Sequence, residues 1–266
     1  MKKTSTRKQL ILFLVISYGY LWLLFVISKL FDIPFTYDPQ QLGGQLVLVG
    51  IPASLVATIL TTLVTGSKED LRKLFKRSLD WRFSFTWYLA GALVPLLVGF
   101  ASTMMAVWLG KAELSENWFS PSMPVGFMVF LLIYIGLGEE IGWRGFALPR
   151  FQEMLGSLGG SIATGVFWAL WHSPLFLMPG SSQYGSSLIL FIYLTTCWTI
   201  PMALFVGKSH GSVIPAILLH ASVNFLAFAI QYPHTYVYLF YGIAAIIAAV
   251  FFPKPLFTQG RTSDGA

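Results

Sequence analysis

The chain has 266 residues, of which 56% are hydrophobic and only 11% are charged, and its mean hydropathy is +0.70. Soluble globular domains are roughly 45–50% apolar, so this composition excludes an ordinary soluble protein. The net charge of +6 could suit a nucleic-acid partner. The distribution of that charge instead indicates a membrane protein, and we expect no nucleic-acid partner.

In chain order, the apolar residues form about eight windows, each close to the ~20 residues that a helix needs to span the hydrocarbon core. Together they occupy most of the chain and leave no room for a separate soluble domain. We therefore predict an all-α fold, a single membrane domain over residues 1–266 with about eight transmembrane helices. The windows are 9–28, 42–64, 87–109, 124–146, 160–178, 187–206, 212–230 and 235–252.

Lysine and arginine are divided unevenly between the two sides of the predicted bundle. If the spans alternate in direction, 15 of the 17 lie on the side of the termini, and only Lys29 and Lys111 lie opposite. This positive-inside pattern predicts that both termini are cytoplasmic. In residues 66–86, basic and apolar residues alternate at helical spacing, which predicts a cytoplasmic amphipathic helix on the membrane surface. The lone Cys197 excludes an intramolecular disulfide.

Two adjacent acids, Glu139 and Glu140, lie in the fourth window, where an ionisable group is costly and marks a candidate functional site. Neighbouring residues of a helix point about 100° apart, so the two acids face different ways. Glu140 can pair with Arg144 four residues later, which leaves Glu139 to face the bundle interior. The alternative is that both acids only mark the cytoplasmic end of this helix.

Two histidines lie in later windows. His172 follows Trp168 by four residues, so the indole can pack beside the imidazole, and Asn224 follows His220 by the same interval. At 1.5 Å per residue, Glu139, His220 and His172 lie about 10, 12 and 18 Å from the predicted cytoplasmic ends of their helices, so they can share one layer. Alternatively, His172 is a hydrogen-bonded core residue, and the other pair is a polar helix–helix contact.

One glutamate and two histidines are the ligand types of a catalytic zinc site that keeps an open position for water. Such a site, for zinc or another divalent metal, would use Glu139, His172 and His220. The same residues suit metal-free hydrolysis, in which the glutamate activates water while histidine and asparagine stabilise the oxyanion. The H-E-x-x-H pattern of soluble zincins is absent, and both mechanisms stay open.

The motifs E-E-x-x-W-R, aromatic-x-x-x-H and H-x-x-x-N, in this order, resemble those of the CAAX protease and bacteriocin-processing family of intramembrane peptidases. The resemblance covers about residues 125–230, which would form the catalytic core. The second motif usually begins with Phe, whereas this chain has Trp168 there. The resemblance implies a membrane-embedded metallo- or glutamate-dependent endopeptidase. It also implies site roles for Glu139, Glu140, His172, His220 and Asn224, with Arg144 and Trp168 in support.

Two other functions stay open. A catalytically silent immunity or regulatory protein would keep the fold, and a proton-coupled transporter would use Glu and His as a relay. A transporter is expected to have two similar halves, which this chain lacks. The complete Glu, His, His and Asn set favours the enzyme. We expect a multi-pass protein of a bacterial cytoplasmic membrane, with membrane lipid and a peptide or protein substrate as partners and no oligomeric state set by the sequence.

Overall fold

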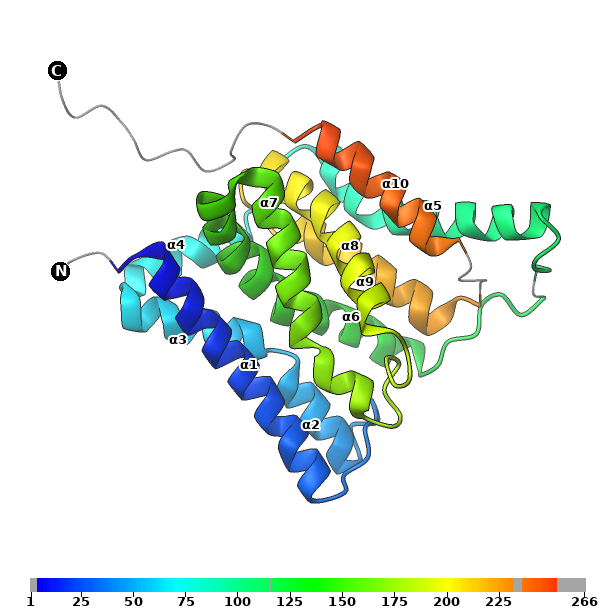
Figure 1. Cartoon of the computed structure of the whole chain (residues 1–266), viewed down its shortest axis with the longest axis horizontal. Coiled ribbons are helices and arrows are strands. Elements are labelled where there is room, and N and C mark those ends of the chain that lie inside the picture. The colour runs from blue at the N-terminus through cyan, green and yellow to red at the C-terminus, as the bar shows by residue number, and fades with distance from the viewer. Residues whose placement is uncertain (1–3, 115, 232–235, 253–266) are drawn as a thin grey trace.

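The computed structural model describes residues 4–114, 116–231 and 236–252, and its regular elements in these ranges are helices (Figure 1). The predicted all-α class is confirmed. A helix satisfies its own backbone polar groups, which is what apolar surroundings require. The elements are α1 Thr6–Leu30, α2 Leu42–Gly50, α3 Ala53–Thr65, α4 Lys68–Ser78, α5 Phe85–Trp108, α6 Val125–Glu140, η1 Ile141–Ala147, α7 Leu148–Trp171, η2 Ser173–Leu177, α8 Leu188–Lys208, α9 Ile214–Ala229 and α10 Val237–Val250.

The number of spans differs from the predicted eight. Within the described ranges, four helical stretches are long and apolar enough to cross a membrane, and the α2–α3 pair, bent by 42°, would make a fifth. Helices α9 and α10 have 16 and 14 residues, fewer than the ~20 of a full span. The count of eight is therefore not confirmed, and the orientation of the termini stays a prediction. The four stretches are Thr6–Leu30, Phe85–Trp108, Val125–Leu177 and Leu188–Lys208.

The stretch Val125–Leu177 contains two of the predicted windows because the chain reverses within it. A straight helix of its 53 residues would be about 80 Å long, far more than a bilayer needs. Gly156 has φ 76°, a left-handed conformation that glycine adopts without strain. A Cβ on Gly160 would lie 2.4 Å from the backbone nitrogen of Gln152, so the two arms meet where only glycine fits.

Helices α6 to α9 form the centre of the molecule, with α1 to α4 on one side and α5 and α10 on the other (Figure 1). One buried cluster joins α1, α3, η1 and α7 through aromatic side chains that include Phe13, Trp143 and Trp171. A second joins α5, α8, α9 and α10 around Phe205 and Tyr241. The acids and histidines singled out in the sequence lie on the central helices, between the two clusters.

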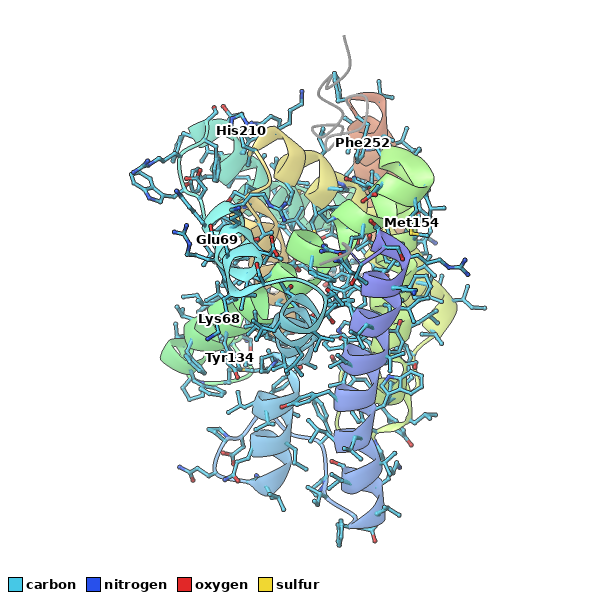
Figure 2. The ribbon with its side chains drawn as sticks, turned by 90° about the vertical axis from the view of Figure 1, so that its left-hand side faces the viewer. Lys68, Glu69, Tyr134, Met154, His210 and Phe252 are labelled. Atoms are coloured by element: carbon cyan, nitrogen blue, oxygen red, sulfur yellow. The ribbon has the colours of Figure 1, made fainter. Side chains whose placement is uncertain are left out.

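The basic segment 66–86 contains helix α4, which Ser67 caps by accepting the backbone N–H of Asp70. Its apolar side, which includes Leu74, packs on α3 and η1. Most of its charged residues are exposed, with Lys68 and Glu69 at its start (Figure 2). Contact between this helix and the membrane surface stays a prediction.

Candidate active site

The two acids lie at the junction of two kinds of helix. Glu139 and Glu140 end α6, and the π-helical η1 follows directly. The wider ladder continues as far as the backbone N–H of Leu148, which donates to the carbonyl of Trp143 five residues earlier. Single π-helical turns are frequent at functional sites, because they change which side chains face inward. Here the change of register coincides with the acids.

Glu140 belongs to a buried ionic network. Its Oε1 accepts from Arg144 Nη1 at 3.1 Å and contacts His220 Nδ1 at 2.8 Å. Both Glu140 and Arg144 have side chains that are 0% exposed. Arg144 Nη2 also donates to Thr199 Oγ1 at 2.8 Å. The helical pairing predicted for Glu140 is present, and the network ties α6 to α9 and η1 to α8.

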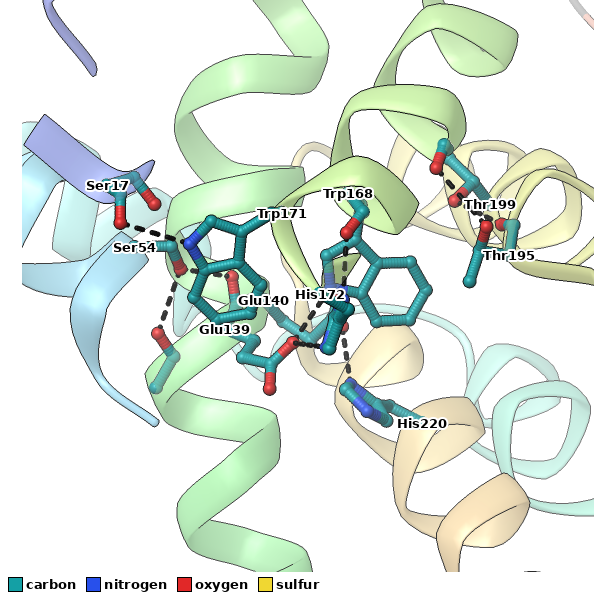
Figure 3. A network of polar contacts seen from close by, with 12 residues as sticks. Ser17, Ser54, Glu139, Glu140, Trp168, Trp171, His172, Thr195, Thr199 and His220 are labelled. Carbon is teal, nitrogen blue, oxygen red and sulfur yellow. Dashed lines mark hydrogen bonds and ion pairs between the residues drawn. The ribbon is translucent and has the colours of Figure 1, made fainter. Parts of the chain in front are cut away.

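Glu139 points away from this network, toward α7. Its Oε2 accepts from the indole Nε1 of Trp168 at 2.8 Å and lies 3.8 Å from His172 Nε2 (Figure 3). The sequence predicted that Glu139 has no partner on its own helix, and both contacts come from α7 and its C-cap. His220 was expected beside Glu139 as a ligand or oxyanion partner, whereas its hydrogen-bonded partner is Glu140.

The two histidines are held so that their Nε2 atoms carry the lone pair when the rings are neutral. His172 Nδ1 lies 2.8 Å from the carbonyl oxygen of Trp168, which can only accept, so the proton is on Nδ1. His220 Nδ1 faces the Glu140 carboxylate, which also accepts. Such a partner on the other ring nitrogen fixes both the tautomer and the ring orientation.

A cavity of about 210 Å³ opens beside these side chains. Its lining includes Glu139, Trp168, His172, His220 and Asn224, and most of the other lining residues are apolar and come from α1, α2, η2, α8 and α9. Among the described residues, Asn224 makes no side-chain hydrogen bond to the other four, and its place is the cavity wall. The structure therefore brings the predicted Glu, His, His and Asn set to a single apolar pocket.

A loop residue that the sequence did not single out also lines this cavity. Tyr37 lies between α1 and α2 and packs its ring against Phe228. Burial, with a further contribution from the Glu139 charge, raises the pKa of the Tyr37 hydroxyl to about 12. The hydroxyl therefore stays protonated at neutral pH and adds no charge to the cavity.

The donors predicted for a metal do not form a closed set. Nδ1 of both histidines is engaged, which leaves Nε2 for coordination, as is usual for metal-bound histidine. Across the described ranges, however, no three His, Cys, Asp or Glu side chains are grouped as a metal site. In this arrangement, Glu139 and His172 are better suited to orient a water molecule than to form part of a three-ligand metal site.

The part of the chain that carries these residues is similar to known proteases. Residues 121–226 match the family model described as type II CAAX prenyl endopeptidase, Rce1-like. CAAX prenyl protease 2 of Methanococcus maripaludis is 26% identical over 204 residues, which are 68% of this chain and 72% of that protein. The resemblance to the CAAX protease family is confirmed. With its long apolar helices, the chain is an integral membrane protein whose relatives are named as proteases.

A residue outside the matched segment 121–226 forms hydrogen bonds to it: Ser54 of α3. The Ser54 hydroxyl lies 3.0 Å from the carbonyl of Gly138 and 3.1 Å from that of Glu139. A change from α to π register can leave a carbonyl without its amide partner, and a buried carbonyl needs one. Sequence reasoning missed Ser54 because α3 has several Ser and Thr residues and no pattern distinguishes one of them.

We expect Ser54→Ala to lower stability by about 1–3 kcal/mol, because it leaves buried carbonyls unsatisfied, and to slow any catalysis that depends on Glu139. Thr58→Val is the matched control. Thr58 is equally buried, and within the described part of the chain its hydroxyl donates only to the Ser54 carbonyl of its own helix. Thermal unfolding in detergent measures the first effect. Equal losses in the two variants would contradict a specific role for Ser54.

Proposed function

We propose that this protein is an intramembrane endopeptidase in which Glu139 activates water to hydrolyse a peptide bond. The observation that carries the proposal is the position of Glu139, a buried carboxylate at the wall of an apolar cavity, with His172 Nε2 3.8 Å from its Oε2. His172 Nε2 and the Glu139 carboxylate can each accept one hydrogen of a single water molecule, which directs the water lone pair at a carbonyl carbon. The names of the relatives support the same reaction class.

In the proposed reaction, the water oxygen bonds to the carbonyl carbon of the scissile peptide while Glu139 takes a proton from the water. The carbonyl electron pair moves to its oxygen, which becomes the oxyanion. Asn224 and His220, on the α9 wall of the cavity, are proposed to stabilise this charge. The asparagine would donate its amide N–H, and the histidine would donate Nε2–H, for which its ring must be protonated. The oxyanion then collapses, the C–N bond breaks, and Glu139 returns its proton to the amine that leaves.

Glu140 and Arg144 have a supporting role in this proposal. Their ion pair holds His220 by Nδ1 and fixes its orientation toward the cavity. If a metal were bound, its donors would be Nε2 of His172, Nε2 of His220 and the Glu139 carboxylate. It would make a bound water molecule more acidic. We propose the glutamate mechanism without a metal, because the described residues include no group of three His, Cys, Asp or Glu side chains that could hold one.

The apolar cavity suits a peptide or protein substrate that arrives from the membrane with apolar groups next to the scissile bond. We propose that lipid surrounds the long apolar helices, whose exposed residues include Leu23 and Phe100. We further propose, from the distribution of Lys and Arg, that the protein lies in a bacterial cytoplasmic membrane with both termini in the cytoplasm.

The proposal is tested with purified protein in liposomes and fluorogenic peptides that end in a Cys-aliphatic-aliphatic-X sequence, with and without a prenyl group on the cysteine. We expect cleavage of at least one peptide by the wild-type protein. Failure to cleave either peptide, or any member of a broader peptide library, would favour the catalytically silent alternative.

Chelation separates the two mechanisms. With 1,10-phenanthroline or EDTA, we expect the cleavage rate to stay within about twofold of the untreated rate, because no metal donates the water in the proposed mechanism. The measurement is the initial rate before and after chelation, with zinc added back as the control. A loss of tenfold or more that zinc restores would replace the glutamate mechanism with a metal-dependent one.

A further inference from the structure

The indole of Trp168 lies in the candidate site and contacts four of its charged or titratable side chains. Its ring centroid is 5.5 Å from that of His172 and 5.2 Å from that of His220. The guanidinium carbon of Arg144 lies 4.1 Å from the ring centroid. Only 1% of the Trp168 surface is exposed, and the side chain lines the cavity and contacts Glu139 (Figure 3).

The N–H of this indole engages one of the two oxygens of Glu139. Nε1 donates to Oε2 at 2.8 Å, and an indole nitrogen can only donate. Oε2 is also the oxygen nearest to His172 Nε2. Within the described parts of the chain, the other oxygen, Oε1, has no hydrogen bond, and its carboxylate lines the cavity. The two oxygens of Glu139 are therefore not equivalent.

We propose that Trp168 is a positioning residue that reserves Oε2 of Glu139 and leaves Oε1 as the oxygen that takes the proton from water. This inference rests on the proposed function, since it says which atom of the proposed base reacts. An oxygen that already accepts a hydrogen bond along one lone pair is a weaker base than its free neighbour. The bond also fixes the side-chain rotamer, so that Oε1 faces the substrate in each turnover.

The position of Arg144 strengthens this bond. A cation over an aromatic face withdraws electron density from the ring, and the N–H of the ring becomes a better donor as a result. Hydrogen bonds to ionised acceptors are already the stronger kind. A phenylalanine, the residue usual at this place in the motif that the chain resembles, has no N–H, so the arrangement depends on the tryptophan of this chain.

The test compares Trp168→Phe with Trp143→Phe. Both tryptophans are buried, at 1% and 0% exposure, but Nε1 of Trp143 has no acceptor among the described residues. We expect Trp168→Phe to lower kcat about 10- to 100-fold with KM within about twofold, which is the effect of losing one hydrogen bond to a charged group. Trp143→Phe reports the cost of shrinking a buried indole, and we expect its kcat to fall less than about threefold.

A third variant removes only the N–H. Trp168→3-benzothienylalanine keeps the shape of the side chain and replaces the nitrogen with sulfur, so we expect it to share the low kcat of Trp168→Phe. Wild-type kcat in this variant would overturn the inference, as would equal kcat in Trp168→Phe and Trp143→Phe. In either of these cases, cleavage that still requires Glu139 would leave the proposed function standing.

A spectroscopic readout applies even if no peptide is cleaved. The ultraviolet resonance Raman difference between the wild-type protein and Trp168→Phe isolates the Trp168 indole among nine tryptophans. We expect its N–H band at the position of a strongly hydrogen-bonded indole, and a shift toward the free position in Glu139→Gln, whose amide oxygen is a weaker acceptor. A free-indole band in the wild-type protein would overturn the inference.

Discussion

Replacing Glu139 with glutamine is expected to lower kcat for peptide cleavage by about 10³-fold or more. Glutamine has nearly the same size and keeps an oxygen that can accept the Trp168 N–H, but its amide cannot take a proton from water. Loss of a positioned general base typically costs 10²–10⁴-fold. The measurement is kcat in proteoliposomes under saturating substrate, together with the thermal unfolding temperature.

Glu153→Gln serves as the control for this substitution. Glu153 lies on α7 and is exposed, and among the described residues it accepts only from the Thr6 hydroxyl. The same chemical change there should therefore leave kcat unaltered. If Glu139→Gln keeps more than a tenth of the wild-type kcat while its fold is intact, another group activates the water, and the proposed mechanism is wrong.

The second large effect is expected on stability. Arg144→Met should destabilise the protein by about 3–5 kcal/mol, because it leaves the fully buried Glu140 charge without its cation. The double variant Glu140→Gln with Arg144→Met removes both charges, and it should recover most of the loss, since replacing a buried pair by neutral groups is often nearly neutral. The unfolding free energy in a denaturant titration in detergent measures both effects.

An exposed arginine provides the comparison. Arg72 of α4 pairs with Glu69 at 2.8 Å, but its side chain is 71% exposed, and ion pairs of this kind contribute little to stability. Arg72→Met should leave the unfolding free energy unchanged within error. If Arg144→Met is as harmless as Arg72→Met, the Glu140 network does not hold the centre of this bundle together.

The helical fold was predictable because apolar runs of sufficient length leave the backbone few alternatives. The number of spans was not, because hydropathy marks where apolar residues are and not where a helix bends or stops. The reversal at Gly156 depends on one residue with positive φ. The bend of 42° between α2 and α3 likewise lies within a single apolar window.

The candidate site was predictable to the extent that its residues are costly in apolar surroundings. Glu139, His172 and His220 stand out for that reason, and the spacing of four residues identified Arg144 as the partner of Glu140. The partner of His220 was not predictable, since it depends on how α9 packs against α6. The π-helical register of η1 escaped prediction as well, because the same apolar residues suit either kind of helix.

The contacts that hold η1 and α7 in place show that the site depends on helices outside the segment that carries its acids and histidines. The segment 121–226 that matches the family model is fixed from outside by side chains or carbonyls of the preceding helices. These contacts are Ser54 to the carbonyls of Gly138 and Glu139, Arg77 Nη2 to the carbonyl of Gly145, and Trp171 Nε1 to the carbonyl of Ser17. The segment is thus not a portable module. A chimera that joins this segment to other N-terminal helices would have to preserve these contacts. Sequence change in α1, α3 and α4 is likewise constrained by the site, although none of these helices contributes an acid or a histidine to it.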